Sequence, residues 1–460
     1  MSIRAESDRQ DMLHGSLWNK LLMFAAPVAA TAILEQLFNA SDIAVVGNFT
    51  GAGKTVAVAA VSANSAVIAL IVNLFVGIAL GANVVIANAI GRDDSETVKK
   101  AVHTSVLISL IVGAAVVIIG ELAAGTLLHS LNVPDDVFPS ALLYLRIYLL
   151  GMPVILLYNF ESAIFRSVGD TRTPLIALAV SGILNVILNL VFVAVFRMTV
   201  NGVAIATVIS NLVSSALLFK RLCRTNQSIH IDIKSLRIDT KTLTRIMQIG
   251  LPAGIQSAVF AVSNIVIQAA INSLGTVVMA ASGAAYNIEI FNYDILNAFS
   301  QACTTFVGQN SGAGNMHRCR KTFALCLAEG FVTLASALTL ILFFGKNLLA
   351  VFNNDPEVVS IGYQRLLIVM IAHSFSFFYE VMSGYLRGFG ISLVPAILTT
   401  VGVCGVRIAW IKFVFPKSET FRTIMTAYPI SLSVTALMIF VALLCYHPSR
   451  RFKKEGDGNE

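Results

Sequence analysis

The sequence predicts an all-α polytopic membrane protein: twelve transmembrane helices in two six-helix lobes related by a parallel internal repeat. The 460 residues are 56% hydrophobic and 12% charged, whereas average soluble domains are about one-quarter charged. A bilayer span needs roughly 20 apolar residues. Twelve apolar runs meet that need, near residues 17–46, 57–90, 101–130, 138–165, 174–196, 200–222, 243–272, 277–309, 322–344, 357–386, 394–415 and 423–445. They leave no room for a long soluble domain.

The two halves of the chain repeat the same landmarks. Four residue pairs share a separation of 221 positions: Gly91 with Gly312, Arg166 with Arg387, Gly169 with Gly390, and Pro174 with Pro395. A fifth pair, Pro27 with Pro252, is separated by four more residues. Each half has an even number of spans, so both halves enter the membrane in one orientation. Such duplicated bundles are typical of secondary transporters, whose site lies between the halves near the midplane.

Charge predicts the domain boundaries and the orientation. We expect an N-terminal lobe over 1–222, a cytoplasmic linker over 223–241, a C-terminal lobe over 242–446 and a cytoplasmic tail over 447–460. Lys and Arg concentrate in alternate short loops, which is the positive-inside pattern. The net charge of +7 therefore reflects topology and not nucleic-acid binding. Both termini are predicted to be cytoplasmic in the plasma (inner) membrane, with no cleavable signal at the charged N-terminus.

Acids inside the first span are the leading candidates for a coupling-ion site. Asp42 lies in this span, and Glu35 lies seven residues earlier, on the same face of a helix. A charge in hydrocarbon costs roughly 2.5–3.5 kcal/mol on insertion scales, so an intramembrane acid is a functional candidate. A carboxyl group in a low-dielectric cavity can take up or release a proton near physiological pH. The alternative is that Asp42 caps the end of the span or pairs with a structural donor.

Polar residues of the fifth and sixth spans are expected to meet Asp42. Asn185 and Asn189 stand at i, i+4 spacing on one helix face, and Thr207 and Asn211 repeat that spacing in the next span. Such side chains also hold membrane helices together without any further role. We expect Asn185, Asn189 and Thr207 to join the coupling-ion site.

The second half offers a different set of charges for its cavity: Glu289, Asp294, Glu380 and Arg407. Arg407 is a buried cation that needs an acid partner, and we expect that partner to be Glu380. With Pro27 set on Pro252, Asn39 falls on Asn264 but Asp42 falls on Ile267. The coupling acid is therefore expected in the first lobe only.

These residues resemble the multidrug and toxic compound extrusion (MATE) family over nearly the whole chain. Four stretches carry the resemblance: Asp42 to Gly47, Arg166 to Pro174 followed by Asn185, Val307 to Gly314, and Arg387 to Gly390 with Pro395. The resemblance implies a two-lobe exporter of amphipathic organic cations that takes protons or sodium in exchange. It also implies that protonation of Asp42 bends the first span near Pro27, the expected hinge.

One departure from the family bears on the coupling ion. Several relatives carry an Asp four residues after the fifth-span Asn, and this position is Asn189 here. The site loses one carboxylate, which disfavours sodium. We therefore favour proton coupling, although Glu289, Asp294 and Glu380 could form a separate sodium site.

The predicted function is a monomeric secondary antiporter that works by alternating access, in contact with membrane lipid. No enzyme activity, cofactor, metal or nucleic-acid partner is expected. One alternative is a lipid-linked-precursor flippase of the same superfamily, although those usually have extra spans and a more cationic cavity. A less favoured one is a membrane-embedded lipid-modifying enzyme using Asp42, Glu35 and His373, for which no nucleophile or metal cluster is visible. A helical receptor fits poorly with the duplication.

Overall fold

The computed structural model describes residues 11–50, 54–131 and 133–449, and this part of the chain contains helices and no strand. The basic tail residues Arg450, Arg451, Lys453 and Lys454 lie outside it. Within the described residues, ten helices are long and apolar enough to cross a membrane. The pair α4 and α5, bent by 50°, makes an eleventh span.

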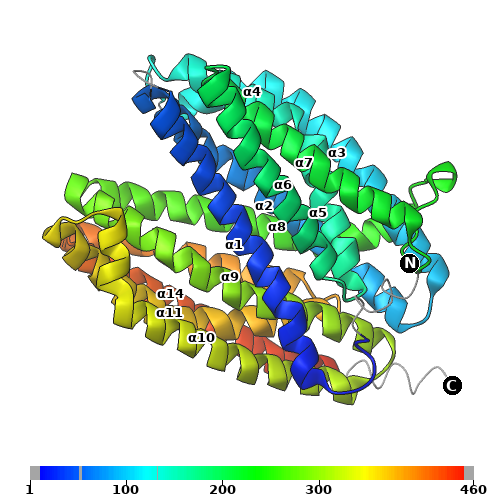
Figure 1. The fold of residues 1–460 in the computed structure, drawn as a ribbon. Helices are drawn as coiled ribbons and strands as arrows, with labels where there is room; N and C mark the ends of the chain where they lie inside the picture. Colours follow the sequence, from blue (N-terminus) through cyan, green and yellow to red (C-terminus); the bar gives the residue numbers. More distant parts are fainter. Residues whose placement is uncertain (1–10, 51–53, 132, 450–460) are drawn as a thin grey trace. The chain divides into compact units, whose positions relative to one another are not determined.

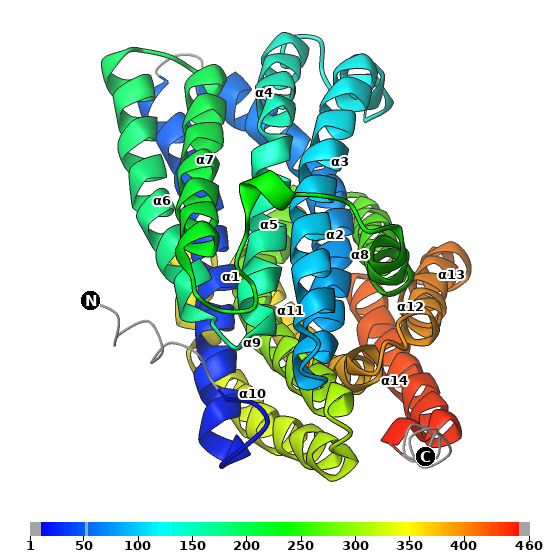
Figure 2. The same cartoon turned by 90° about the vertical axis from the view of Figure 1, so that its right-hand side faces the viewer.

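Each half contributes six spans (Figures 1 and 2). The first six are α1 (Leu17–Phe49), α2 (Lys54–Gly91), α3 (Ser95–Ser130), α4 (Phe138–Leu150) with α5 (Met152–Ser167), α6 (Arg172–Leu190) with the π-helix η2 (Val191–Val195), and α7 (Val200–Arg224). The other six are α8 (Thr240–Asn272), α9 (Thr276–Gly312), α10 (Met316–Phe352), α11 (Pro356–Gly388), α12 (Leu393–Thr399) continued by η4 (Thr400–Gly405) and α13 (Val406–Phe413), and α14 (Phe421–Tyr446). The short 3-10 helices η3 (Ile233–Ser235) and η5 (Phe415–Lys417) lie between spans.

The span that sequence hydropathy identifies least well is α9. It carries Glu289 and Asp294 and is not among the helices apolar enough to cross by composition. Both acids are nevertheless buried, as are most residues in the second half of the helix. Because neighbouring helices and not lipid surround it there, α9 can be polar and still supply the twelfth span.

The predicted repeat is visible in the backbone. Gly169 follows α5 and Gly390 follows α11, with positive φ angles of 86° and 80°. Their amides donate equivalent hydrogen bonds, to the carbonyl oxygen of Arg166 at 3.0 Å and of Arg387 at 2.8 Å. Glycine adopts this left-handed conformation without the steric cost that a Cβ brings. Two turns 221 residues apart are thus built in the same way.

The chain forms two compact units. Among the described residues, unit 1 comprises Ala30–Ile90 and Asp94–Gly250, and unit 2 comprises Asp11–Ala29, Gly91–Asp93 and the chain from Leu251 onward. The helix α1 passes from unit 2 to unit 1 after Ala29, and α8 passes from unit 1 to unit 2 after Gly250. Each change of unit falls within two residues of an internal proline, Pro27 or Pro252. The first helix of each half therefore has the same feature, a change of unit beside an internal proline.

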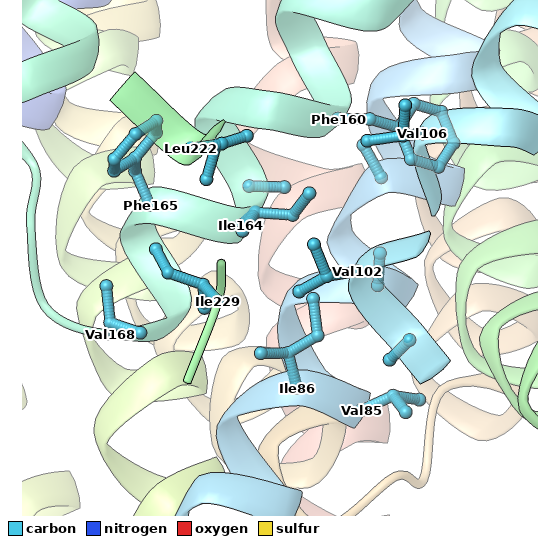
Figure 3. Close-up of a cluster of buried hydrophobic side chains, with 14 of the residues drawn as sticks. Val85, Ile86, Val102, Val106, Phe160, Ile164, Phe165, Val168, Leu222 and Ile229 are labelled. Atoms are coloured by element: carbon cyan, nitrogen blue, oxygen red, sulfur yellow. The ribbon is translucent and has the colours of Figure 1, made fainter. Parts of the chain in front are cut away.

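Unit 1 is held together by apolar side chains from α2, α3, α5 and α7. Figure 3 shows Ile86, Val102, Ile164 and Leu222 converging with Ile229 of the linker. This linker segment forms neither a strand nor a regular helix, yet Ile229 is buried. Dispersion contacts of this kind, and not the hydrophobic effect, hold helices together inside a membrane.

Glycines bring two helices of unit 1 into backbone contact. A Cβ on Gly81 of α2 would lie 2.3 Å from the carbonyl oxygen of Ile246, and one on Gly250 would lie 2.6 Å from that of Ile78. Neither position has room for a larger side chain. Small residues at the crossing of membrane helices permit this close approach, so α8 begins firmly attached to α2.

Unit 2 includes the first part of α1. Leu17, Leu21 and Phe24 are buried in a cluster with residues of α9, α10 and α11. The rings of Phe24 and Phe306 meet edge to face with centroids 5.7 Å apart. The segment before α1 is also fixed, since Arg318 donates a hydrogen bond of 3.0 Å to the carbonyl oxygen of Met12.

Candidate functional site

Asp42 is the centre of a buried polar cluster in unit 1. Its side chain is 5% exposed, and each carboxylate oxygen accepts one hydrogen bond. Asn189 donates to Oδ1 at 2.6 Å and Thr207 donates to Oδ2 at 3.1 Å. All the hydrogen-bond partners are neutral, so the described residues offer this carboxylate no counter-charge.

The two asparagines of α6 connect the cluster to α7, which lies beside α6 in both views (Figures 1 and 2). Asn189 donates to Oδ1 of Asn185 at 3.0 Å, and Asn185 donates to the hydroxyl of Thr207 at 3.4 Å. The i, i+4 spacing places both amides on one face of α6, as the sequence indicates. Asn211 takes no part, because its amide donates to the carbonyl oxygen of Thr207 within α7.

Glu35 has a different environment from Asp42. It lies two turns earlier on α1 and is exposed, whereas Asp42 is buried. Glu35 interacts electrostatically with Tyr158 and with Arg166, both on α5. Helical periodicity places Glu35 and Asp42 on one face of α1. Their surroundings nevertheless differ, because they lie two turns apart along the helix.

In unit 2, four of the buried charged residues form two ion pairs. Arg365 of α11 forms a two-pronged ion pair with Glu289 of α9, with N–O distances of 2.7 and 2.9 Å. The Arg365 guanidinium also donates to the hydroxyl of Ser282. Both charged side chains are at most 5% exposed. The pair is neutral as a unit, with the planar fork geometry that suits arginine and carboxylate.

The expected partnership between Glu380 and Arg407 is wrong. Glu380 instead pairs with Arg387, seven residues later on α11, at 3.5 Å. Two helical turns bring residues i and i+7 to one face, so Glu380 has a cation on its own helix. Arg407, on α13, has only neutral hydrogen-bond acceptors among the described residues, Ser431 at 3.1 Å and Asn264 at 3.4 Å.

The remaining candidates of unit 2 are buried but separate. Asp294 is 8% exposed, and its Oδ2 has no hydrogen-bond partner in the described part of the chain. His373 lies 3.3 Å from the amide of Asn292, a neutral contact. The structure does not gather Glu289, Asp294 and Glu380 into one ion-binding group, since two of them are already paired with arginines.

Sequence reasoning missed the buried charges Arg365 of α11, Glu161 of α5 and Glu329 of α10. Arg365 stands inside the apolar run over 357–386, so the criterion that selected Arg407 selects it equally. Glu161 of α5 is fully buried and accepts a hydrogen bond of 2.9 Å from Ser215 of α7. Glu161 stands near the C-terminal end of the apolar run over 138–165.

Twelve spans, a duplicated build and buried charges in each half define a multi-pass membrane transporter. The MatE family model matches the chain twice, over residues 27–191 and 252–411. Each match begins at the internal proline of the first helix of a half. The matches together cover more than half of the chain, which therefore belongs to the MatE family.

Relatives of known name agree with this assignment. The chain is 24% identical to the probable multidrug resistance protein YoeA of Bacillus subtilis, over 92% of this chain and 93% of that protein. It is 27% identical to the probable multidrug resistance protein YpnP of the same organism, over 85% and 87%. An outward-facing structure of a multidrug resistance MATE family transporter of the MOP superfamily superposes with a TM-score of 0.86, at 21% identity, covering 96% of this chain and 98% of that one. The fold is therefore that of a membrane transporter and not of an enzyme.

Proposed function

We propose that this protein is a secondary antiporter that exports amphipathic organic cations in exchange for protons, and that Asp42 carries the proton. The observation that supports this proposal most directly is the Asp42 cluster, a buried carboxylate with neutral hydrogen-bond partners. Such a group gains from binding a proton, because the neutral form removes an uncompensated charge from a low-dielectric site. The relatives named as multidrug resistance proteins support the substrate class.

Asn189 can supply the hydrogen-bond acceptor that a protonated Asp42 would need. A protonated carboxyl group needs one hydrogen-bond acceptor, whereas the ionised group accepts only. The Oδ1 atom of Asn189 is buried and has no hydrogen-bond partner in the described part of the chain. Rotation of this amide would present Oδ1 to a protonated Asp42. Protonation would thereby change the contact between α1 and α6.

The helix α1 then links that change to movement. It continues through Pro27 and is shared between the two units. A proline inside a helix removes one backbone hydrogen bond and makes bending less costly at that point. In the proposal, the protonation state of Asp42 sets how far α1 bends at Pro27. The protein thereby binds substrate and proton in turn.

Protons are favoured over sodium for a chemical reason. Hard cations prefer several oxygen ligands and more than one carboxylate. The cluster of Asp42, Asn185, Asn189 and Thr207 offers one carboxylate. In unit 2, Glu289 and Glu380 are held by arginines and are poor additional ligands.

The test is transport of ethidium in proteoliposomes at fixed membrane potential, with one gradient imposed at a time. A pH gradient alone should drive transport, and a sodium gradient alone should not. Transport driven by sodium alone, with none driven by the pH gradient, would overturn the proton assignment. Transport of ethidium under neither gradient would overturn the antiport function itself.

Orientation and location complete the proposal. We propose a plasma (inner) membrane location with both termini and the 223–241 linker in the cytoplasm, because Lys and Arg concentrate on that side. A cysteine introduced at Lys234 of the linker should be unreactive to an impermeant maleimide in intact cells and reactive after lysis. Replacing Cys445, which is exposed, with serine removes the main background. Strong labelling of intact cells at position 234 would reverse the topology.

A further inference from the structure

Three arginines of unit 2 are buried: Arg365, Arg387 and Arg407. Among the described residues, Arg365 and Arg387 have carboxylate partners and Arg407 has none. Arg407 is 2% exposed. Its Nε donates to the hydroxyl of Ser431 at 3.1 Å and its Nη1 to Oδ1 of Asn264 at 3.4 Å. Its guanidinium carbon lies 4.3 Å from the ring centre of Tyr428 and 5.4 Å from that of Phe260. The side chain is thus fixed between aromatic rings by neutral groups.

The positive charge at this position cannot be removed by deprotonation. Arginine keeps its proton in proteins, so burial leaves the guanidinium charged. An unpaired charge inside a membrane protein is costly and marks a functional site by default. Glu289 is bound by Arg365 and Glu380 by Arg387, and no carboxylate of a described residue forms an ion pair with Arg407. The Arg407 side chain therefore places a positive charge without an ion-pair partner inside the second unit.

The internal repeat gives this site a position equivalent to the Asp42 cluster. At the separation of 221 residues, Thr207 of α7 corresponds to Tyr428 of α14, and Asn185 of α6 corresponds to Val406, next to Arg407. At the separation that aligns the two prolines, the residue matching Asp42 is Ile267 on α8, the helix that also carries Asn264. Corresponding helices thus hold a carboxylate in unit 1 and a guanidinium in unit 2.

The geometry suits an oxyanion attached to an aromatic or aliphatic body. The Nη2 atom of Arg407 donates no hydrogen bond to any described residue, and an arginine fork can bind both oxygens of a carboxylate. The rings of Tyr428 and Phe260 add an apolar surface beside the charge. We propose that Arg407, with Asn264 and Tyr428, forms a subsite for a carboxylate carried by the exported molecule. This inference rests on the proposed export function and names the residues that would recognise the carboxylate of a zwitterionic substrate.

A matched pair of dyes tests the proposal on the unmodified protein. Rhodamine 123 and rhodamine 110 share one cationic xanthene, but the carboxyl group is a methyl ester in the first and free in the second. Binding to the full-length protein in lipid nanodiscs is followed by fluorescence anisotropy. A charge-assisted hydrogen bond to the free carboxylate should make rhodamine 110 bind about tenfold more tightly. Equal or weaker binding of rhodamine 110 overturns the proposal without any variant.

Variants then assign the preference to Arg407. Arg407→Gln should remove the tenfold preference for rhodamine 110, and Arg407→Lys should retain part of it. Arg422→Gln, an exposed arginine of α14, is the matched control and should keep the full preference. A preference that survives Arg407→Gln overturns the assignment. If that variant does not fold, Asn264→Ala, which removes the acceptor of Nη1, replaces it and should reduce the preference; an unchanged preference again overturns the assignment.

Failure of the two proposals can be told apart. Export of rhodamine 123 under a pH gradient tests the antiport function alone. If rhodamine 123 is exported and rhodamine 110 has no advantage, only the carboxylate subsite is wrong. If neither dye is exported or bound, the export function is wrong and the subsite falls with it.

Discussion

The two units of this transporter share a scaffold and differ in the sign of a buried charge without an ion-pair partner, Asp42 in unit 1 and Arg407 in unit 2. In unit 1, Asp42 is a carboxylate surrounded by amides and a hydroxyl. In unit 2, Arg407 is a guanidinium surrounded by an amide, a hydroxyl and aromatic rings. The turns at Gly169 and Gly390 remain alike in φ and in hydrogen bonding. Duplication preserved the backbone geometry, and the chemistry of each half diverged through a few buried side chains.

This comparison separates two kinds of buried charge. The Glu289–Arg365 pair is neutral as a unit, so removing one member would leave the other charge buried without its partner. Asp42 and Arg407 have no such partner in the described chain, so each carries a desolvation cost that packing alone does not require. We expect replacement of paired charges to affect folding and replacement of unpaired charges to affect transport.

The largest effect is expected from Asp42→Asn, which keeps the shape of the side chain and removes its ability to carry a proton. Export of ethidium driven by a pH gradient should fall to the level of liposomes without protein. The variant should insert and fold, because an amide in this neutral cluster avoids a buried charge. Export and drug resistance at the wild-type level would remove Asp42 from the mechanism.

The next largest effect concerns the buried pair of unit 2. Glu289→Gln leaves Arg365 buried without its counter-charge and should lower the free energy of unfolding by about 3–5 kcal/mol. Denaturation of the purified protein in detergent measures the loss. The matched control is Glu121→Gln in unit 1, whose pair with Arg146 is half exposed and should contribute under about 1 kcal/mol. Similar losses for the two variants would contradict the distinction between buried and exposed pairs.

A smaller effect is expected at the edge of the Asp42 cluster. Thr207→Val removes one of the two hydrogen bonds to the carboxylate, an interaction with a charged group worth about 1.5–3 kcal/mol. Initial rates of pH-driven ethidium export should fall about tenfold and remain above background. Thr244→Val, an exposed threonine at the start of α8, controls for the loss of a hydroxyl. If Thr207→Val abolishes transport as completely as Asp42→Asn, the hydroxyl has a larger role than orienting Asp42.

The smallest effect tests the shared scaffold. Gly169→Ala and Gly390→Ala each place a Cβ at a positive φ and should each cost about 1–2 kcal/mol. The two losses in thermal stability should agree, since the turns are equivalent. Gly125→Ala is the control, because Gly125 lies inside α3 with nothing within 4 Å of its Cβ position, and alanine favours the helix there. Markedly unequal losses at 169 and 390 would show that the two turns are not interchangeable.

Much of the site was predictable because it depends on local periodicity. Spacing alone placed Asn185 and Asn189 on one face of α6, and the rarity of acids in apolar runs identified Asp42. The partner of Arg407 was not predictable in this way. Glu380 could pair either with a cation on its own helix, α11, or with one on a neighbouring helix. The sequence does not show which cation lies closer in space. Glu380 therefore paired with Arg387, and Arg365, overlooked in its apolar run, paired with Glu289.

The sequence by itself determined the spans, the duplication and the candidate acid of the first span, because each follows from composition or from a constant spacing along the chain. The tertiary structure alone decided which charges are compensated and which helix segments belong to which unit. Burial and pairing depend on distances between residues far apart in the chain, as between Asp42 and Asn189 or Arg407 and Asn264. Only packing fixes these distances, and the energy of a buried charge depends on them.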